Sequence, residues 1–165
     1  MMLFSRNMGL LILCCIAEGA AINSQAAENP LSYYVDSANG NDANNGISPE
    51  TAWQSLNNAN HRIFQPGDRL LFKAGGRWDG QLRLKGSGLA NRPIKIGSYG
   101  EGSLPVIDQG KLAGVAVQFE DQDFWEMTGI EVDGGSPKPD QKVGGIHFLT
   151  TSAGRIEVTS LFQAR

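Results

Sequence analysis

The chain has 165 residues, which is enough for one domain of ordinary size and too few for two. Its 41% apolar and 19% charged residues allow a packed core and argue against disorder. The formal net charge of −3 argues against a nucleic-acid partner, because nucleic-acid-binding surfaces usually carry a basic excess. Glycine, at 21 residues, is about twice as frequent as usual and indicates many tight turns.

Residues 1–26 have the features of a secretory signal peptide. Arg6 supplies the positive charge, residues 8–17 form an apolar stretch too short to cross a bilayer, and small residues follow. Cleavage after Ala26 is indicated by the Ser-Gln-Ala sequence at residues 24–26, with residues 19–21 as the alternative. We therefore expect a secreted or periplasmic protein with no membrane segment after cleavage.

Both cysteines of the chain, Cys14 and Cys15, lie inside this leader. The exported chain would then contain no cysteine. This excludes disulfide bonds, cysteine nucleophiles and thiolate metal sites.

Residues 27–66 are predicted to form an N-terminal cap that begins with a short strand at residues 33–35. The following segment, residues 36–46, is rich in Asn, Asp and Gly, which favour tight turns that bond to their own backbone. Its side-chain oxygens also allow a calcium site, although their spacing does not match an EF-hand loop. The candidate calcium ligands would be Asp36, Asn39, Asn41 and Asp42.

A helix is predicted over residues 48–63. Ser48 is a favourable N-cap, Pro49 suits the first helical position, and Glu50 places an acid in the first turn. Apolar residues then recur at helical spacing on one face, which indicates an amphipathic helix covering an open sheet edge. That face consists of Ala52, Leu56, Ala59 and Ile63, flanked by Trp53.

From residue 67 onward the chain consists of brief apolar segments that repeat. Residues 94–99, 125–130 and 156–161 align at a constant spacing of 31 residues, with the shared order apolar, charged, apolar, small, small, apolar. A second column contains residues 82–84, 117–119 and 146–148, and a third pairs residues 107–108 with 132–133. Short strands and several turns in about 30 residues fit one coil of a parallel β-helix.

The alternation within each segment predicts which side chains face inward. Two internal stacks are expected, Ile94 with Trp125 and Ile156, and Ile96 with Met127 and Val158. Two external ladders are expected, Lys95 with Glu126 and Glu157, and Arg83 with Gln118 and His147.

Residues 33–56, 65–73 and 93–110 resemble the N-terminal cap and first coils of secreted bacterial right-handed parallel β-helix proteins of the pectate-lyase-like superfamily. The resemblance implies an all-β solenoid, a right-handed parallel β-helix with an N-terminal amphipathic capping helix. Residues 67–165 would be its first coils, incomplete because the chain stops after about three of them without a C-terminal cap. We therefore expect a chain that is truncated at the C-terminus.

The same resemblance implies a polysaccharide lyase that cleaves acidic glycans, such as pectate or alginate, by β-elimination with calcium. The fragment alone is expected to be inactive and monomeric. The alternative is a noncatalytic β-helix that binds carbohydrate or serves as a surface adhesin, so the sequence leaves open whether the protein is an enzyme.

Three outward positions are candidates for this chemistry. Glu126 and Glu157, one strand spacing apart, would hold calcium, or would be two solvated carboxylates balanced by Lys95. His147 would act as a base or sugar ligand, or would simply be solvated, whereas His61 is expected only to favour the end of the helix.

Two further residues are candidate substrate ligands. Trp78, in a turn-like sequence beside a cation, would stack on a sugar ring, or would fold over the junction with the cap. Arg83 would bind a substrate carboxylate, with Lys142 and Arg155 as further cations for the same purpose. Asp121 and Asp123 fit a turn and could join the site at Glu126. No spacing identifies the catalytic base.

Overall fold

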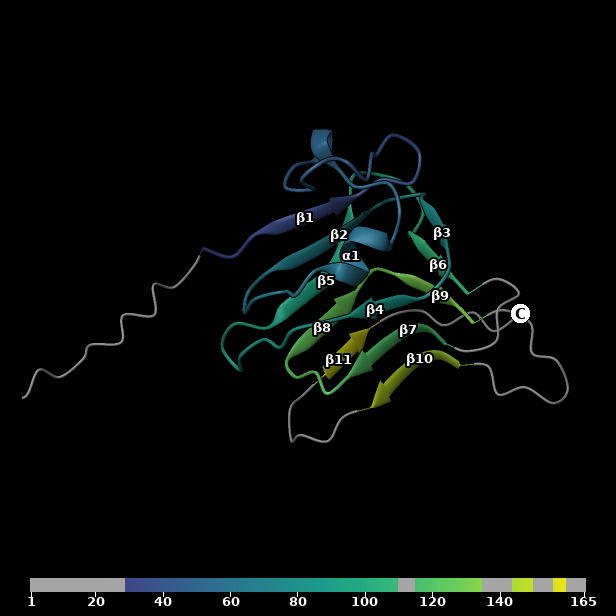
Figure 1. The fold of residues 1–165 in the computed structure, drawn as a ribbon. Helices are drawn as coiled ribbons and strands as arrows, with labels where there is room; N and C mark the ends of the chain where they lie inside the picture. Colours follow the sequence, from purple (N-terminus) through teal and green to yellow (C-terminus); the bar gives the residue numbers. More distant parts are fainter. Residues whose placement is uncertain (1–28, 110–114, 135–143, 150–155, 160–165) are drawn as a thin grey trace, which may run out of the picture.

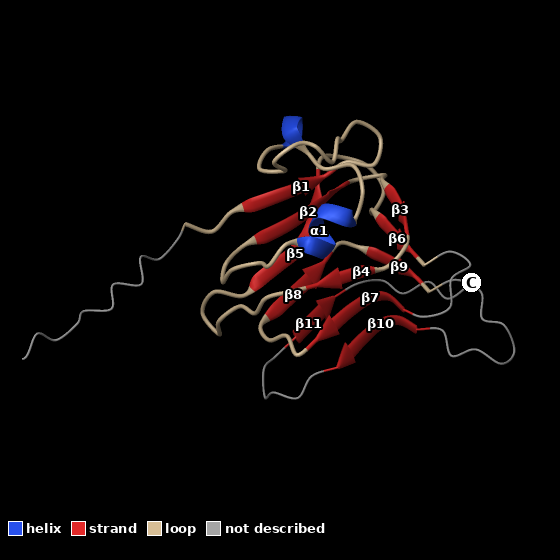
Figure 2. Cartoon of the chain, viewed as in Figure 1, coloured by secondary structure: helices blue, strands red, loops and turns tan. Residues whose placement is uncertain are grey.

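The computed structural model describes residues 29–109, 115–134, 144–149 and 156–159, with the last two segments described by their backbone and strand pairing (Figures 1 and 2). The described chain is mostly β, as predicted, and its strands pair in parallel. The predicted signal peptide lies outside the described residues. Among the described residues, no helix is long and apolar enough to cross a membrane.

The strands form three parallel sheets. The first has five strands in the order β1 (Ser32–Val35), β2 (Arg69–Lys73), β5 (Ile94–Tyr99), β8 (Trp125–Thr128) and β11 (Ile156–Thr159). The second has the order β10 (Gly144–Leu149), β7 (Val115–Glu120) and β4 (Leu82–Leu84). The third has the order β3 (Arg77–Asp79), β6 (Val106–Asp108) and β9 (Glu131–Asp133). From β2 onward the chain enters each sheet in turn and returns to the same sheet one strand further along (Figure 1).

The register of the strands is the one predicted from the repeats. In the first sheet Lys95 pairs with Glu126, which pairs with Glu157. In the second sheet Arg83 pairs with Gln118, which pairs with His147. The third column is also confirmed, because β6 and β9 pair through Ile107 with Val132 and Asp108 with Asp133.

The inward-facing side chains of the three sheets form one apolar core. Ile96 and Met127 are fully buried at adjacent positions, whereas the Lys95 side chain between Ile94 and Ile96 is 50% exposed. This confirms the predicted register in β5 and β8, since a shift by one residue would exchange the two faces of a strand.

Aromatic rings connect the cap to this core. The Tyr33 ring stacks on Trp53 at a centroid distance of 5.2 Å and meets Phe64 edge-on at 5.6 Å. Trp125 contacts both Phe64 and Phe119, each with centroids 5.6 Å apart. Edge-to-face and stacked pairs at such distances add to the stabilisation from burial. The cap therefore packs as part of the core.

The single helix predicted over residues 48–63 is wrong, because the segment is divided into a 3-10 turn, η1 (Pro49–Thr51), and a short helix, α1 (Asn57–His61). Ser48 does cap the first turn, accepting the backbone N–H of Thr51. The chain then becomes extended because Trp53 pairs beside β1, donating to the Tyr34 carbonyl and accepting from the Asp36 N–H. Ile63, expected on the buried face, is 62% exposed.

The helix α1 lies against β4, the outer strand of the second sheet (Figure 2). The side chain of Asn60 bonds to the backbone on both sides of Leu82. Its Nδ2 donates to the Gln81 carbonyl at 2.9 Å, and its Oδ1 accepts the Arg83 N–H at 2.7 Å. The amide thus takes the place of a neighbouring strand and covers this edge of the sheet, whereas the apolar face of a longer helix was predicted to do so.

Candidate functional site

The outer ladder of the first sheet contains an ion pair. The Lys95 ammonium lies 2.8 Å from a Glu126 carboxylate oxygen, and both side chains are partly exposed. The backbone of Glu157 pairs with Glu126, but the Glu157 side chain lies outside the described residues. Within the described segments, no three His, Cys, Asp or Glu side chains are grouped to hold a metal ion. Calcium at Glu126 and Glu157 therefore stays a prediction.

The Asn- and Gly-rich loop of the cap bonds to itself. Asp36 accepts the N–H groups of Ala38 and Asn39 at 2.9 and 3.0 Å. Asp42 accepts the N–H groups of Gln54 and Ser55, both at 2.9 Å. The contacts of Asp36 are those expected of a self-bonded loop, and the contacts of Asp42 join the loop to residues 54–55. Calcium binding in this loop stays a prediction.

Trp78 lies in the core and presents no free ring face to a sugar. It is 4% exposed, packs edge-on against Phe72, and donates its indole N–H to the Gln54 carbonyl at 2.9 Å. The structure thus places it at the junction with the cap, the alternative to sugar stacking. The physical reason is strand alternation, since Trp78 is the inward residue between outward Arg77 and Asp79 in β3.

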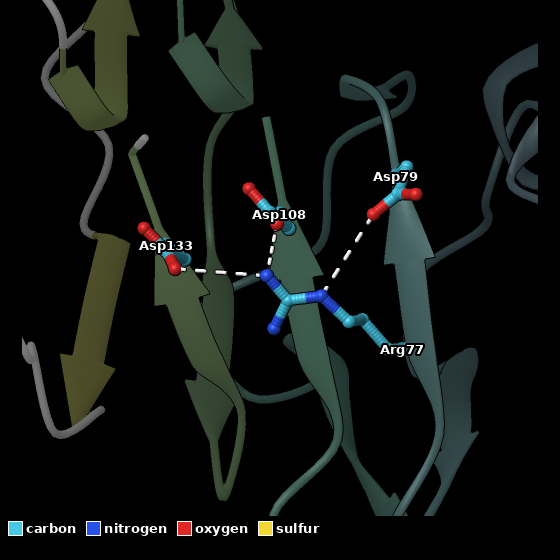
Figure 3. Close-up of polar contacts among 4 residues, drawn as sticks. All are labelled: Arg77, Asp79, Asp108 and Asp133. Atoms are coloured by element: carbon cyan, nitrogen blue, oxygen red, sulfur yellow. Dashed lines mark hydrogen bonds and ion pairs between the residues drawn. The ribbon is translucent and has the colours of Figure 1, made fainter. Parts of the chain in front are cut away.

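The third sheet carries a ladder of three aspartates around one arginine (Figure 3). Asp79, Asp108 and Asp133 occupy paired positions at the ends of β3, β6 and β9. The Arg77 guanidinium bonds to Asp108 and lies 3.8 Å from Asp79 and 3.7 Å from Asp133. The repeats predicted the alignment of Asp108 with Asp133, but not the reach of Arg77 across three strands.

The charges of this ladder act on the arginine. Burial alone would lower the pKa of Arg77, but the hydrogen bond to Asp108 and the charges of Asp108, Asp133 and Asp79 outweigh it, so the pKa is raised. One cation is thus shared by three acids that are aligned by strand pairing. The Arg77 guanidinium thus contacts carboxylates at the ends of three paired strands.

A groove of about 790 Å³ lies where α1 meets the outer face of β4 and β7. Its walls contain the amides and charged side chains of these three elements and of the turn after β7. The lining residues are Asn60, His61, Gln81, Arg83, Leu84, Lys85, Gln118, Glu120, Asp121 and Gln122. We refer to it as the β4–β7 groove.

Hydrogen bonds connect the side chains along the floor of the β4–β7 groove. The Arg83 Nε donates to Gln81 Oε1 at 2.6 Å, and Gln81 Nε2 donates to Gln118 Oε1 at 3.2 Å. Gln118 Nε2 in turn lies 3.5 Å from a Glu120 carboxylate oxygen. The side chains of this row are therefore hydrogen-bonded to one another along the groove.

Of the residues predicted for a site, the groove includes Arg83 and Asp121, and His61, predicted only to favour the end of the helix, also lines it. His147 pairs through its backbone with Gln118 on the next strand, but its side chain is not described. Sequence reasoning did not assign the other polar lining residues to a site, among them Asn60, Gln81, Lys85, Glu120 and Gln122. The alternation that places Arg83 outward also places residues 81 and 85 outward, so a signal for part of the groove was present.

No family model matches the chain. Among curated proteins, a lacto-N-biosidase of Bifidobacterium longum subsp. longum is 33% identical over 134 residues, which are 78% of this chain and 8% of that protein. The alpha-1,3-galactosidase A of Akkermansia muciniphila is 37% identical over 73 residues, 44% of this chain and 12% of that protein. The chain thus spans about a tenth of the length of these curated relatives.

Among solved structures, the chain is similar to the GH136 lacto-N-biosidase of Eubacterium ramulus. The selenomethionine derivative superposes with a TM-score of 0.64 at 25% identity, over 72% of this chain and 24% of that chain. The native protein gives a TM-score of 0.58 at 24% identity, over 77% of this chain and 26% of that chain.

These similarities correct two predictions. The resemblance to the pectate-lyase-like superfamily is wrong, because the similar solved structures are those of a GH136 lacto-N-biosidase, a member of a glycoside hydrolase family, and the first curated match is also a lacto-N-biosidase. The predicted polysaccharide lyase acting by β-elimination is wrong for the same reason, since these homologues are hydrolases. The error has a physical origin, because cap and repeat patterns report the packing of a scaffold and carry no signal for the reaction.

Proposed function

We propose that this chain forms part of a glycoside hydrolase that acts on oligosaccharides. The observation that supports this most strongly is the 33% identity to a lacto-N-biosidase over 78% of the chain. The second curated relative is also named as a glycosidase, although for a different linkage. The two names share hydrolysis of a glycosidic bond, and this shared chemistry is what we propose for the protein.

We further propose that residues 67–165 are the first coils of a right-handed parallel β-helix and that residues 27–66 are its cap. The regular return of the chain to each of three parallel sheets supports this, as does the 31-residue spacing of the repeats. Parallel crossover connections are almost always right-handed, which supports the proposed hand. An exported protein, with residues 1–26 as its signal peptide, would meet oligosaccharides outside the cell.

The part that this chain supplies is a scaffold and a glycan-contacting surface. Glycoside hydrolysis ordinarily requires two carboxyl groups, one to protonate the leaving oxygen and one to act as base or nucleophile. Three of the described carboxylates on adjacent strands are bound to cations instead, Asp108 and Asp133 by Arg77, and Glu126 by Lys95. We therefore propose that the catalytic pair lies outside the described residues.

The test uses the reading frame that contains this sequence, determined beyond the codon for Arg165. The purified product is incubated with the p-nitrophenyl glycoside of lacto-N-biose, from which released nitrophenol is measured by absorbance, and with α-1,3-linked galactobiose, from which released galactose is measured. Release from either glycoside supports the proposal. Glycan binding without any release would instead identify the noncatalytic carbohydrate-binding alternative.

A further inference from the structure

We propose that the β4–β7 groove is a binding subsite for a neutral oligosaccharide, an inference that rests on the proposed function and adds a site to it. The groove is formed by outward side chains of two paired strands and by one short helix, so its walls are held by the fold. Its volume of about 790 Å³ lies in the range of about 300–1,000 Å³ that is usual for small-ligand sites.

The chemistry of the walls suits a polyhydroxylated ligand. Sugar hydroxyls both donate and accept hydrogen bonds, and side-chain amides offer both functions on one planar group. Asn60, Gln81 and Gln118 place three amides in the groove. Their mutual contacts and the bonds of Asn60 to the β4 backbone fix their orientation, which lowers the ordering cost of binding.

The charges of the groove favour a neutral ligand over an anionic one. Arg83 and Lys85 supply two positive charges, and Glu120 and Asp121 supply two negative charges. An anionic sugar near the cations would also face the two acids, so it would gain little net attraction. In the described part of the chain neither Arg83 nor Lys85 makes an ion pair, which leaves the terminal guanidinium nitrogens of Arg83 available as donors.

The turn that closes one end of the groove has an unusual backbone. Asp121 and Phe124 adopt φ angles of +51° and +55°, and a bulky residue such as Phe seldom occupies this left-handed region. Between them Gln122 is 9% exposed, donates its Nε2 to the Glu120 carbonyl, and leaves its Oε1 without a hydrogen bond in the described structure. Unfavourable local conformations of this kind are concentrated at ligand sites.

The experiment is a calorimetric titration of the chain with lacto-N-biose, a neutral disaccharide, and with its sialylated form. We expect saturable binding of the neutral sugar and no tighter binding of the sialylated one. Arg83→Met removes the guanidinium donors but keeps the aliphatic stem, and should weaken the neutral sugar about tenfold, the effect of one charge-assisted hydrogen bond. Lys85→Met tests the second cation independently.

Lys95→Met is the matched control, since it makes the same kind of change on the outer face of the first sheet. It should leave the dissociation constant within about twofold, and circular dichroism should show an unchanged fold for all three variants. Absence of saturable binding to the neutral sugar, unchanged affinity in folded Arg83→Met, or tighter binding of the sialylated form would each overturn the groove proposal.

The binding and hydrolysis experiments together distinguish failure of the groove proposal from failure of the proposed function. Binding that depends on Arg83, together with no hydrolysis by the full reading frame, would keep the subsite and reject the hydrolase. Hydrolysis whose KM is the same in Arg83→Met would keep the hydrolase and reject the subsite.

Discussion

At the scale of single residues, Asp36 shows how one buried carboxylate organises the cap. Its side chain accepts the N–H groups of Ala38 and Asn39, and the residue is 8% exposed. Burial by itself would raise the pKa of Asp36, but the hydrogen bonds and the charge of Lys73 outweigh it and lower the pKa below the ordinary value of 3.8. The charged form therefore stabilises the folded loop.

We expect Asp36→Asn to lower the free energy of unfolding at pH 7 by about 1 kcal/mol, because neutral acceptors bond more weakly than carboxylates. The pKa is lowered on folding, so this stabilisation is present above pH 3.8 and is lost as the pH falls through the folded value. Urea denaturation should therefore show a difference from wild type that narrows below pH 3.8. Asp79→Asn, at an 80% exposed side chain, should have little effect at either pH. A difference that widened in acid would contradict the role of the charge.

Trp78 shows what residue-scale prediction misses. Its polar neighbours and the following glycine resemble a turn. Arg77, Trp78 and Asp79 nevertheless form β3, in which only Trp78 points inward. The burial of one side chain depends on what covers it, and the covering Gln54 carbonyl lies 24 positions earlier in the chain. Local sequence predicts alternation well, but it does not identify such distant partners.

At the scale of elements, the edge of β4 is protected by a side chain instead of a strand. We expect Asn60→Ala to lower the melting temperature and to increase self-association, because it exposes the Gln81 carbonyl and the Arg83 N–H. A loss of about 1–3 kcal/mol is the usual cost of such unpaired groups. Thermal unfolding and light scattering measure the two effects.

Asn57→Ala is the control for that change, since Asn57 is an exposed residue of the same helix. It removes the same side chain and should leave both readouts near wild type. Equal behaviour of the two variants would mean that α1 does not protect the edge through Asn60.

The ladder on the first sheet allows a direct test of the calcium prediction. If Glu126 and Glu157 share a calcium ion, a calcium titration should show a saturable heat that Glu126→Gln removes. Lys95→Met should strengthen that binding, because the ammonium 2.8 Å from Glu126 competes with the ion. Identical titrations of wild type and Glu126→Gln would reject the site.

The cap helix shows where element-scale prediction reaches its limit. Ser48 and Pro49 correctly marked the start of a helical turn, because capping is a local interaction. The helix nevertheless ends after Thr51, since Trp53 gains two backbone hydrogen bonds beside β1. The pairing of Trp53 with β1 thus outweighed the helical spacing of apolar residues in the sequence.

At the scale of the whole molecule, the three parallel sheets were predictable because aligned segments of the sequence repeats have apolar residues at the same positions, which are buried in successive strands. Equivalent positions in successive strands pair at the expected register, for example Lys95 with Glu126. The β4–β7 groove was predictable only in part, because its α1 wall depends on how the cap folds over the sheet. The reaction was not predictable, because the same kind of scaffold serves several chemistries.

The shared core predicts strongly unequal effects for two adjacent residues of β8. Met127 is fully buried, so Met127→Ala should cost about 2–5 kcal/mol through lost burial and a cavity. Thr128 is exposed, and Thr128→Ala should stay within about 0.5 kcal/mol of wild type. Chemical denaturation of both variants measures the contrast, and equal losses would contradict the inward orientation of Met127.

The last prediction concerns what the 165-residue chain does by itself. Catalysis by a glycoside hydrolase needs two carboxyl groups held on opposite sides of the bond, one of them protonated. Asp108, Asp133 and Glu126, which lie on neighbouring strands, are instead engaged by Arg77 and Lys95, in line with the proposal that the catalytic pair lies outside the described residues. We therefore expect the isolated chain to bind lacto-N-biose without releasing nitrophenol from its p-nitrophenyl glycoside. The assay is run beside the product of the longest reading frame that contains the sequence, and the release rates are compared at equal molar concentration. Release by the isolated chain at a rate comparable to that product would show that its own residues complete the catalytic pair.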